Sequence, residues 1–330
     1  MITGMLSSRP KLAIVLGAAV AAAPAPAVAA PVERATVGTS DGARSYLVAR
    51  PGRKIAGLRP LVLVLHGHGG SAEQALGLDG RSSPLAVWLD VAEREGLVIA
   101  ALSGARGSDG RQGWDDCRSD APDNPRTDDV AFARAVIARL VREDAVDPTR
   151  VYAIGMSNGG FMAFRLALEL DPPLAAVAAF SSSMAAASLC GPPGHPISVL
   201  MVAGTADPII PFAGGQVTLL GRARGTSVGI EEAAASWRRA DRLADPSTMT
   251  EIPHRGGTDD PTRAMRSVWG TDPSGLQVEL VRIEGGGHIE PSLSQRYGQL
   301  YQHLVGRQNH DLESVEEAWR FFKDKRATIR

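Results

Sequence analysis

The chain is poor in several features whose absence narrows its function. It has 2 cysteines in 330 residues, and 5% of its residues are aromatic. Acidic and basic side chains nearly cancel, 36 against 35, so we expect no basic face of the kind that binds nucleic acid. There is also no Gly-x-Gly-x-x-Gly, no phosphate-binding lysine motif and no internal repeat. These absences argue against nucleic-acid binding, a bound nucleotide and a repeat architecture.

A run long enough to span a membrane is missing as well. The apolar run near the N-terminus, Leu12 to Ala23, is shorter than the roughly 20 residues that a spanning helix needs. It follows the basic Arg9 and Lys11 and precedes the small residues 27–30, which is the layout of a secretory signal peptide. We therefore predict that residues 1–30 are a cleaved signal peptide and that the protein is secreted, to the periplasm or the medium. An uncleaved anchor or an Ala/Pro-rich tail is the alternative.

The two cysteines, Cys117 and Cys190, are interpreted in the light of this export. In an exported protein an even pair favours a disulfide. Closing a loop of that length would stabilise the fold by roughly 4 kcal/mol in the chain-entropy model. Two buried free thiols are the alternative, because a bond requires Cα atoms that lie close together.

One stretch indicates a catalytic nucleophile. The apolar run Val151–Met156 leads into Gly-x-Ser-x-Gly around Ser157, and residues 161–170 have helical spacing. Strand, tight turn and helix in this order are the context of a nucleophile elbow. Gly155 and Gly159 would let strand and helix approach each other, and the helix would direct its N-terminal N–H groups at the site. A serine in an ordinary glycine-rich turn is the alternative, but the flanking pattern favours the nucleophile.

Strand and helix patterns alternate along the chain. Apolar or alternating runs predict strands at 44–51, 61–65, 97–102, 151–156, 175–180, 197–203 and 277–283, and helical spacing predicts helices at 85–94, 127–140, 161–170, 231–243 and 313–325. The Gly-, Asp- and Ser-rich residues 103–125 are expected to form a long loop. Residues 245–272, rich in Pro, Gly, Thr and Asp, are expected to form a surface excursion or a small cap. We therefore expect residues 31–330 to form one catalytic domain with a doubly wound, mostly parallel sheet and helices on both faces, the α/β hydrolase fold.

The first candidate binding loop, His66-Gly67-His68-Gly69-Gly70, directly follows the strand 61–65. Loops at the carboxyl ends of parallel strands carry ligand chemistry in open sheets. The glycines would let the His68 N–H point into the site, so we expect the N–H groups of His68 and Asn158 to form an oxyanion hole. His66 is interpreted as a packed structural residue. A metal at His66 and His68 would need further ligands, which the sequence does not supply nearby, so no metal or cofactor is predicted.

Two later loops supply partners for Ser157. Asp207 follows the strand 197–203, where this architecture places the acid that orients a catalytic histidine. His288 follows three glycines after the strand 277–283, on a loop that could swing its ring toward Ser157. Histidine is the residue type best suited to take and return a proton near neutral pH. Trp114, in the loop 103–125, either walls the substrate cleft or pins the loop.

Together these motifs resemble those of the secreted esterases of the polyhydroxybutyrate-depolymerase type, a group that includes feruloyl esterases acting on plant cell walls. The resemblance runs from about Arg44 to Phe322, on Arg44-x-Tyr46, Leu65-His66-Gly67-x-Gly69-Gly70, Asp128-Asp129-Val130-x-Phe132, Arg150-Val-Tyr152 through Gly160, Gly204-Thr205-x-Asp207-Pro208, Gly285-Gly286-Gly287-His288 and Trp319-x-Phe321-Phe322. It implies ester hydrolysis through Ser157, Asp207 and His288.

The chain departs from this family at two places that should border the cleft. The family often has a cysteine where this chain has His68, and a tryptophan before proline where this chain has Ile289-Glu290-Pro291. We expect these changes to affect the substrate rather than the triad. A Glu290 that points inward would disfavour anionic substrates.

The sequence therefore predicts a serine carboxylic ester hydrolase that acts through an acyl-enzyme. Hydroxyalkanoate (hydroxybutyrate) oligoesters or polymer and feruloylated polysaccharide are the expected substrates. A serine peptidase or a lipase would use the same triad, and a non-catalytic α/β-hydrolase-fold binding protein is the alternative from another class. The sequence does not specify an oligomeric state.

Overall fold

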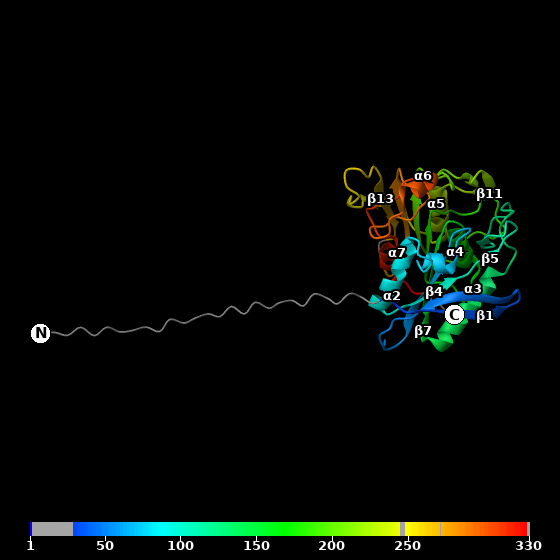
Figure 1. Ribbon diagram of the computed structural model, residues 1–330, viewed down its shortest axis with the longest axis vertical. Coiled ribbons are helices and arrows are strands. Elements are labelled where there is room, and N and C mark those ends of the chain that lie inside the picture. Colours follow the sequence, from blue (N-terminus) through cyan, green and yellow to red (C-terminus); the bar gives the residue numbers. More distant parts are fainter. Residues whose placement is uncertain (2–28, 245–247, 271, 329–330) are drawn as a thin grey trace.

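The computed structural model describes Met1 and residues 29–244, 248–270 and 272–328 (Figure 1). Its centre is a ten-stranded sheet in the order β1-β2-β4-β3-β7-β8-β9-β14-β13-β12. These strands are β1 (Val32–Thr39), β2 (Gly42–Ala49), β3 (Arg59–Leu65), β4 (Val98–Leu102), β7 (Val146–Met156), β8 (Ala176–Phe180), β9 (Ser198–Gly204), β12 (Thr248–Glu251), β13 (Arg263–Trp269) and β14 (Val278–Glu284). Neighbours from β4 to β14 in this order pair in parallel and the outer neighbours pair antiparallel. The sheet is therefore mostly parallel, as predicted.

Helices cover both faces of this sheet. They are α1 (Ala72–Ala75), α2 (Trp88–Glu95), α3 (Asp129–Glu143), α4 (Asn158–Glu169), α5 (Ile230–Ala240), α6 (Gln299–Val305) and α7 (Ser314–Phe322), with a short 3₁₀ helix at Pro84–Val87. One apolar cluster joins the sheet to α3, α4 and α5, and the other joins it to α1, α2 and α7. The prediction of a doubly wound α/β hydrolase fold is confirmed.

Strand β3 shows why the central strands are continuous apolar runs. Leu61, Leu63 and Leu65 lie in the first cluster, whereas Val62 and Val64 lie in the second. All five side chains are fully buried, because a parallel strand covered on both faces has no solvent side.

The edges of the sheet differ from the sequence-based expectation. Residues 245–272 were expected to form a surface excursion or a small cap, but β12 and β13 pair antiparallel next to β14 and extend the sheet. Strand β1, which pairs with β2, was not expected. Edge strands such as β1 expose much of their surface and are often polar or charged, so they lack the apolar pattern that marks the central strands.

The N-terminal prediction lies almost wholly outside the described residues. The expected signal peptide, residues 1–30, falls on residues 2–28, which the structure does not describe. Within the described part of the chain, no helix is long and apolar enough to cross a membrane.

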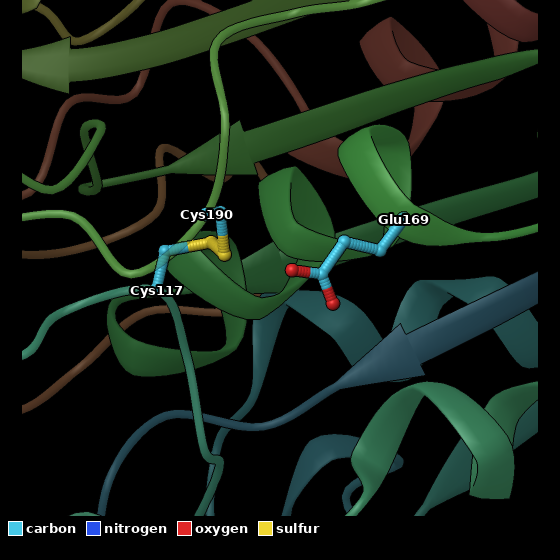
Figure 2. A group of neighbouring side chains, drawn as sticks. All are labelled: Cys117, Glu169 and Cys190. Carbon is cyan, nitrogen blue, oxygen red and sulfur yellow. A yellow bond between two sulfur atoms is a disulfide. The ribbon is translucent and has the colours of Figure 1, made fainter.

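The two cysteines form a disulfide (Figure 2). Their Cα atoms lie 5.4 Å apart, within the range that such a bond requires. Beside it, the Leu189 N–H donates to Cys117 O and the Ser119 N–H donates to Ala187 O, each at 2.8 Å. The bond thus attaches the loop 103–125 to the segment that follows β8, and the disulfide prediction is confirmed.

Glu169 of α4 approaches this disulfide (Figure 2). Cys117, Glu169 and Cys190 offer ligand atoms within 4.8 Å of one another, which no other trio of His, Cys, Asp or Glu does among the described residues. A cysteine binds a metal as a thiolate, and these two sulfurs are bonded to each other instead. Glu169 also accepts a hydrogen bond from Arg165 Nε at 3.0 Å. This group is therefore a covalent crosslink beside a surface ion pair.

Candidate active site

Ser157 lies in a strained turn between β7 and α4. Its φ is 56° and its ψ is −124°, a conformation that costs a non-glycine residue free energy and is typical of functional turns. A Cβ at Gly155 would lie 2.0 Å from Gly159 O, and a Cβ at Gly159 would lie 2.2 Å from Leu65 O. Both positions of the Gly-x-Ser-x-Gly pattern therefore require glycine, because strand, helix and the end of β3 are in direct contact.

The structure brings the three candidate catalytic side chains together from the carboxyl ends of three strands. His288 Nε2 lies 2.9 Å from Ser157 Oγ, and His288 Nδ1 lies 2.7 Å from Asp207 Oδ2. Asp207 also accepts hydrogen bonds from the N–H groups of Ile209 and Ile210, at 2.8 and 2.9 Å. With Nδ1–H donating to the carboxylate, Nε2 is free to accept the serine proton.

The glycines before His288 serve close packing. A Cβ at Gly287 would lie 2.3 Å from Gly306 Cα, and the His288 N–H donates to Val305 O at 2.6 Å. The sequence predicts a loop that swings its ring toward the serine. In the structure the backbone of this loop is instead held against residues 305–307, because the Gly287 and His288 N–H groups donate to Arg307 O and Val305 O.

The loop after β3 lies against the nucleophile. A Cβ at Gly67 would lie 3.5 Å from Ser157 Cβ, and Gly69 adopts a φ of 77°, which glycine tolerates best. Among the described residues, the N–H groups of His68 and Asn158 donate to no protein acceptor. They therefore remain available to a ligand beside Ser157.

The two histidines of this loop have different roles. His66 accepts a hydrogen bond from the Gly104 N–H at 3.0 Å, and burial lowers the pKa of His66 to about 4. It is a neutral structural residue, as predicted. The His68 ring instead lies 2.9 Å from Asp109 Oδ2, and burial, followed by the charge of Arg224, lowers the pKa of His68.

A cavity of about 530 Å³ opens over Ser157 and His288. Its walls come from the loop after β3, from α1 and the 3₁₀ helix, from the hairpin of β10 (Gly215–Leu219) and β11 (Arg222–Ser227), and from the α6 region. The side chains that matter most for ligand chemistry are Arg111, Glu290, Tyr297 and Tyr301.

Two residues expected in the cleft lie elsewhere. Trp114 is fully buried and is not part of the cavity wall; its Nε1–H donates to His66 O at 2.8 Å, so it pins the long loop. Ile289 packs in an apolar cluster with Phe161, Val217 and other buried side chains. Its neighbour Glu290 takes the place on the wall, because consecutive side chains point in different directions.

Glu290 is the expected cleft residue that does line the cavity. It is 5% exposed, and burial raises the pKa of Glu290 to about 7, against the opposing effects of its own backbone N–H and of His288. A carboxyl group therefore faces the ligand space and changes its charge near neutral pH.

The sequence reasoning missed the aromatic wall. Tyr297 and Tyr301 pack with ring centroids 4.8 Å apart, and burial, with the nearby Glu290, raises the pKa of Tyr301 to about 12. Their four-residue spacing, in a chain with few aromatics, was the available signal. Arg111, also missed, lies on the same wall in an exposed position.

Solved structures with this fold include several esterases, and the likeness concerns the fold alone. An acetyl xylan esterase from Aspergillus awamori superposes with a TM-score of 0.53 at 13% identity, over 82% of this chain and 98% of that chain. A thermostable esterase gives a TM-score of 0.51 at 14% identity, over 89% of this chain and 63% of that chain. No family model matches the sequence.

Sequence relatives carry names from the same class. NocK of Nocardia uniformis subsp. tsuyamanensis, whose name assigns it to the esterases, is 33% identical over 273 residues, which are 79% of this chain and 73% of NocK. Feruloyl esterase B of Piromyces equi is 29% identical over 201 residues, 59% of this chain and 34% of that protein.

The fold and the relatives together define a carboxylic ester hydrolase of the α/β hydrolase fold. The chain belongs to the esterase family that includes NocK.

The buried carboxyl of Glu290 makes stability depend on pH. Its pKa is about 7 in the folded protein against 4.5 unfolded, so the folded state retains a proton that the unfolded state has lost between these values. The free energy of unfolding therefore falls as pH rises from 4.5 through 7, by about 3 kcal/mol from this group. A glutamine at position 290 cannot ionise, so the variant Glu290→Gln lacks this loss. In urea unfolding we therefore expect the free energy of unfolding of Glu290→Gln, relative to that of the wild type, to be higher at pH 8 than at pH 5 by most of this amount.

The matched control is Glu232→Gln, at an exposed position on α5. Its stability relative to the wild type should not change between the two pH values. The raised pKa of Asp241, also about 7 through burial, is common to all three proteins and cancels. An equal effect of Glu290→Gln at pH 5 and pH 8 would contradict the assignment.

Proposed function

We propose that the protein is an exported serine esterase that works through Ser157, His288 and Asp207. The observation that carries the proposal is the pair of hydrogen bonds on His288, 2.9 Å to Ser157 Oγ and 2.7 Å to Asp207 Oδ2. This is the geometry that a nucleophile, its base and the acid that orients the base require.

The proposed reaction proceeds in two halves. Ser157 Oγ attacks the ester carbonyl while its proton passes to His288 Nε2, and Asp207 stabilises the resulting imidazolium. The N–H groups of His68 and Asn158 donate to the oxyanion, and in comparable sites the loss of one such donor lowers kcat by roughly 10²–10³. His288 then protonates the departing alcohol and activates the water that hydrolyses the acyl-enzyme.

We place esters of neutral, hydroxylated aromatic acids first among the substrates. Tyr297 and Tyr301 supply an aromatic wall for a ring, and five relatives carry feruloyl esterase in their names. Hydroxybutyrate esters, which have no ring for this wall to contact, are the second candidate. A lipase is less well supported, because residues 245–272, the region in which the sequence allows a small cap, contribute β12 and β13 to the sheet.

Export is part of the same proposal. The predicted signal peptide, residues 1–30, would direct the chain to a compartment in which the disulfide between Cys117 and Cys190 forms and persists. The ester substrate would then be met outside the cytoplasm.

The catalytic proposal is tested with p-nitrophenyl acetate and the mature protein. We expect a burst of p-nitrophenol equal to the enzyme concentration, or steady turnover, in the wild type. Ser157→Ala should lose at least 10³-fold in kcat, because the nucleophile is gone. Equal turnover by both folded proteins, or none by the wild type, would contradict the proposal.

The substrate proposal is tested with a panel of esters and one amide. Methyl ferulate should give a higher kcat/KM than ethyl 3-hydroxybutyrate, and p-nitroanilide substrates should be inert. The ratio of kcat/KM for p-nitrophenyl hemisuccinate to that for p-nitrophenyl butyrate should fall as pH rises through 7, because Glu290 then becomes anionic. Glu290→Gln should remove this fall. A ratio that falls equally in both proteins would exclude Glu290 as the cause.

A further inference from the structure

The backbone of Asn158 offers one of the two free N–H groups, and its side chain is held at three points. Asn158 Oδ1 accepts from the Trp114 N–H at 2.9 Å, and Nδ2 donates to Trp114 O at 3.3 Å and to Asp116 Oδ2 at 2.7 Å. Asp116 is fully buried. The side chain next to the nucleophile is thus attached to the loop 103–125.

Asp116 is in turn held by a buried arginine. Arg118 donates to both carboxylate oxygens of Asp116, with Nη2 2.6 Å from Oδ2 and Nε 3.1 Å from Oδ1. The guanidinium lies 4.0 Å from the ring centroid of Phe161, in the first turn of α4. Its Nη1 donates to Arg224 O, on β11, at 2.7 Å. Both ends of this ion pair therefore contact the helix that begins at Asn158.

Arg224 of β11 also connects this ion pair to His68, the residue that offers the other free N–H. Arg224 Nη2 and His68 Nε2 both lie 2.9 Å from Asp109 Oδ2. Burial alone would raise the pKa of Asp109, but hydrogen bonds from Arg224, from the Arg111 N–H and from His68 lower it below its usual range. Asp109 is thus a carboxylate, and the His68 ring donates to it.

Gly113 lies between the side chains of Asn158 and His68. A Cβ at Gly113 would lie 3.0 Å from Asn158 Oδ1 and 3.1 Å from His68 Nδ1. The loop 103–125 therefore contacts the side chains of both N–H donors directly, and its place is set by the disulfide at Cys117.

We propose that Asp116 and Asp109 are positioning residues, which hold the two oxyanion donors through the hydrogen-bonded series Asn158, Asp116, Arg118, Arg224, Asp109 and His68. The inference rests on the proposed function, because it assigns the network to the oxyanion hole of that mechanism. The donors act on charge that develops in the transition state, so the network affects kcat and not substrate affinity.

The test compares Asp116→Asn and Asp109→Asn with the control Asp115→Asn. Asp115 belongs to the same loop, but its carboxylate pairs with Arg165 at 3.3 Å and with Arg126 at 3.4 Å. Phenylboronic acid is the probe, since it forms a tetrahedral adduct on the serine and resembles the transition state. For the two network variants we expect kcat to fall by about 10- to 100-fold with KM unchanged, and the inhibition constant of the boronate to rise by a similar factor.

The inhibition constant of the boronate distinguishes a loss of oxyanion-donor positioning from a loss of folded protein. A variant that is only partly folded has fewer active sites, but each remaining site binds the boronate as the wild type does. Should Asp116→Asn fail to fold around the buried Arg118, Asp109→Asn decides the matter alone. A boronate inhibition constant within twofold of the control in every folded network variant would overturn the proposal. Failure of the proposed function would appear elsewhere, as turnover that Ser157→Ala retains.

Discussion

The turn at Ser157 is the constraint on which the rest of the active site depends. A positive φ at a non-glycine residue costs of order 1–3 kcal/mol and persists only where surrounding structure enforces it. Here the enforcement comes from three sides: the Ser157 N–H donates to Phe180 O at 2.9 Å, Gly159 abuts the end of β3, and a Cβ at Gly160 would lie 2.5 Å from Ser182 Cβ. The parallel core thus determines where the serine hydroxyl points.

The loop 103–125 complements this rigid core. It has little regular structure, yet it is attached by the disulfide, by the buried Trp114 and by the ion pair of Asp116 with Arg118. The chain has two cysteines, and both form the disulfide that attaches this loop. A loop of this length without helices or long strands is usually either functional or disordered, and its contacts with His68 and Asn158 favour function.

The sequence allowed the central architecture and the triad to be predicted, for physical reasons. A strand buried on both faces must be a continuous apolar run, so β3, β4, β8 and β9 were recognisable. Ser157, Asp207 and His288 follow such strands in the order that this fold uses, and the structure places their side chains in contact. Their catalytic roles remain predictions.

Other features were not recognisable, because they depend on contacts between distant segments. Strand β12 is a short polar edge strand that pairs with β13, and β13 is a partly buried strand that pairs with β14. The cavity wall combines Arg111 with Glu290 and Tyr301, and no local pattern relates these positions. Of the residues expected at the cleft, Glu290 lines the cavity and Trp114 does not, since the sequence does not reveal on which side of a loop a side chain lies.

The central claim, that Ser157 is the nucleophile activated by His288, is tested most directly by covalent trapping. The protein would be treated with diethyl p-nitrophenyl phosphate, digested and mapped by mass spectrometry. The account predicts one diethylphosphoryl group per chain, on Ser157, formed at least 10²-fold more slowly in His288→Ala. Labelling at another residue, or an equal rate in the histidine variant, would contradict it.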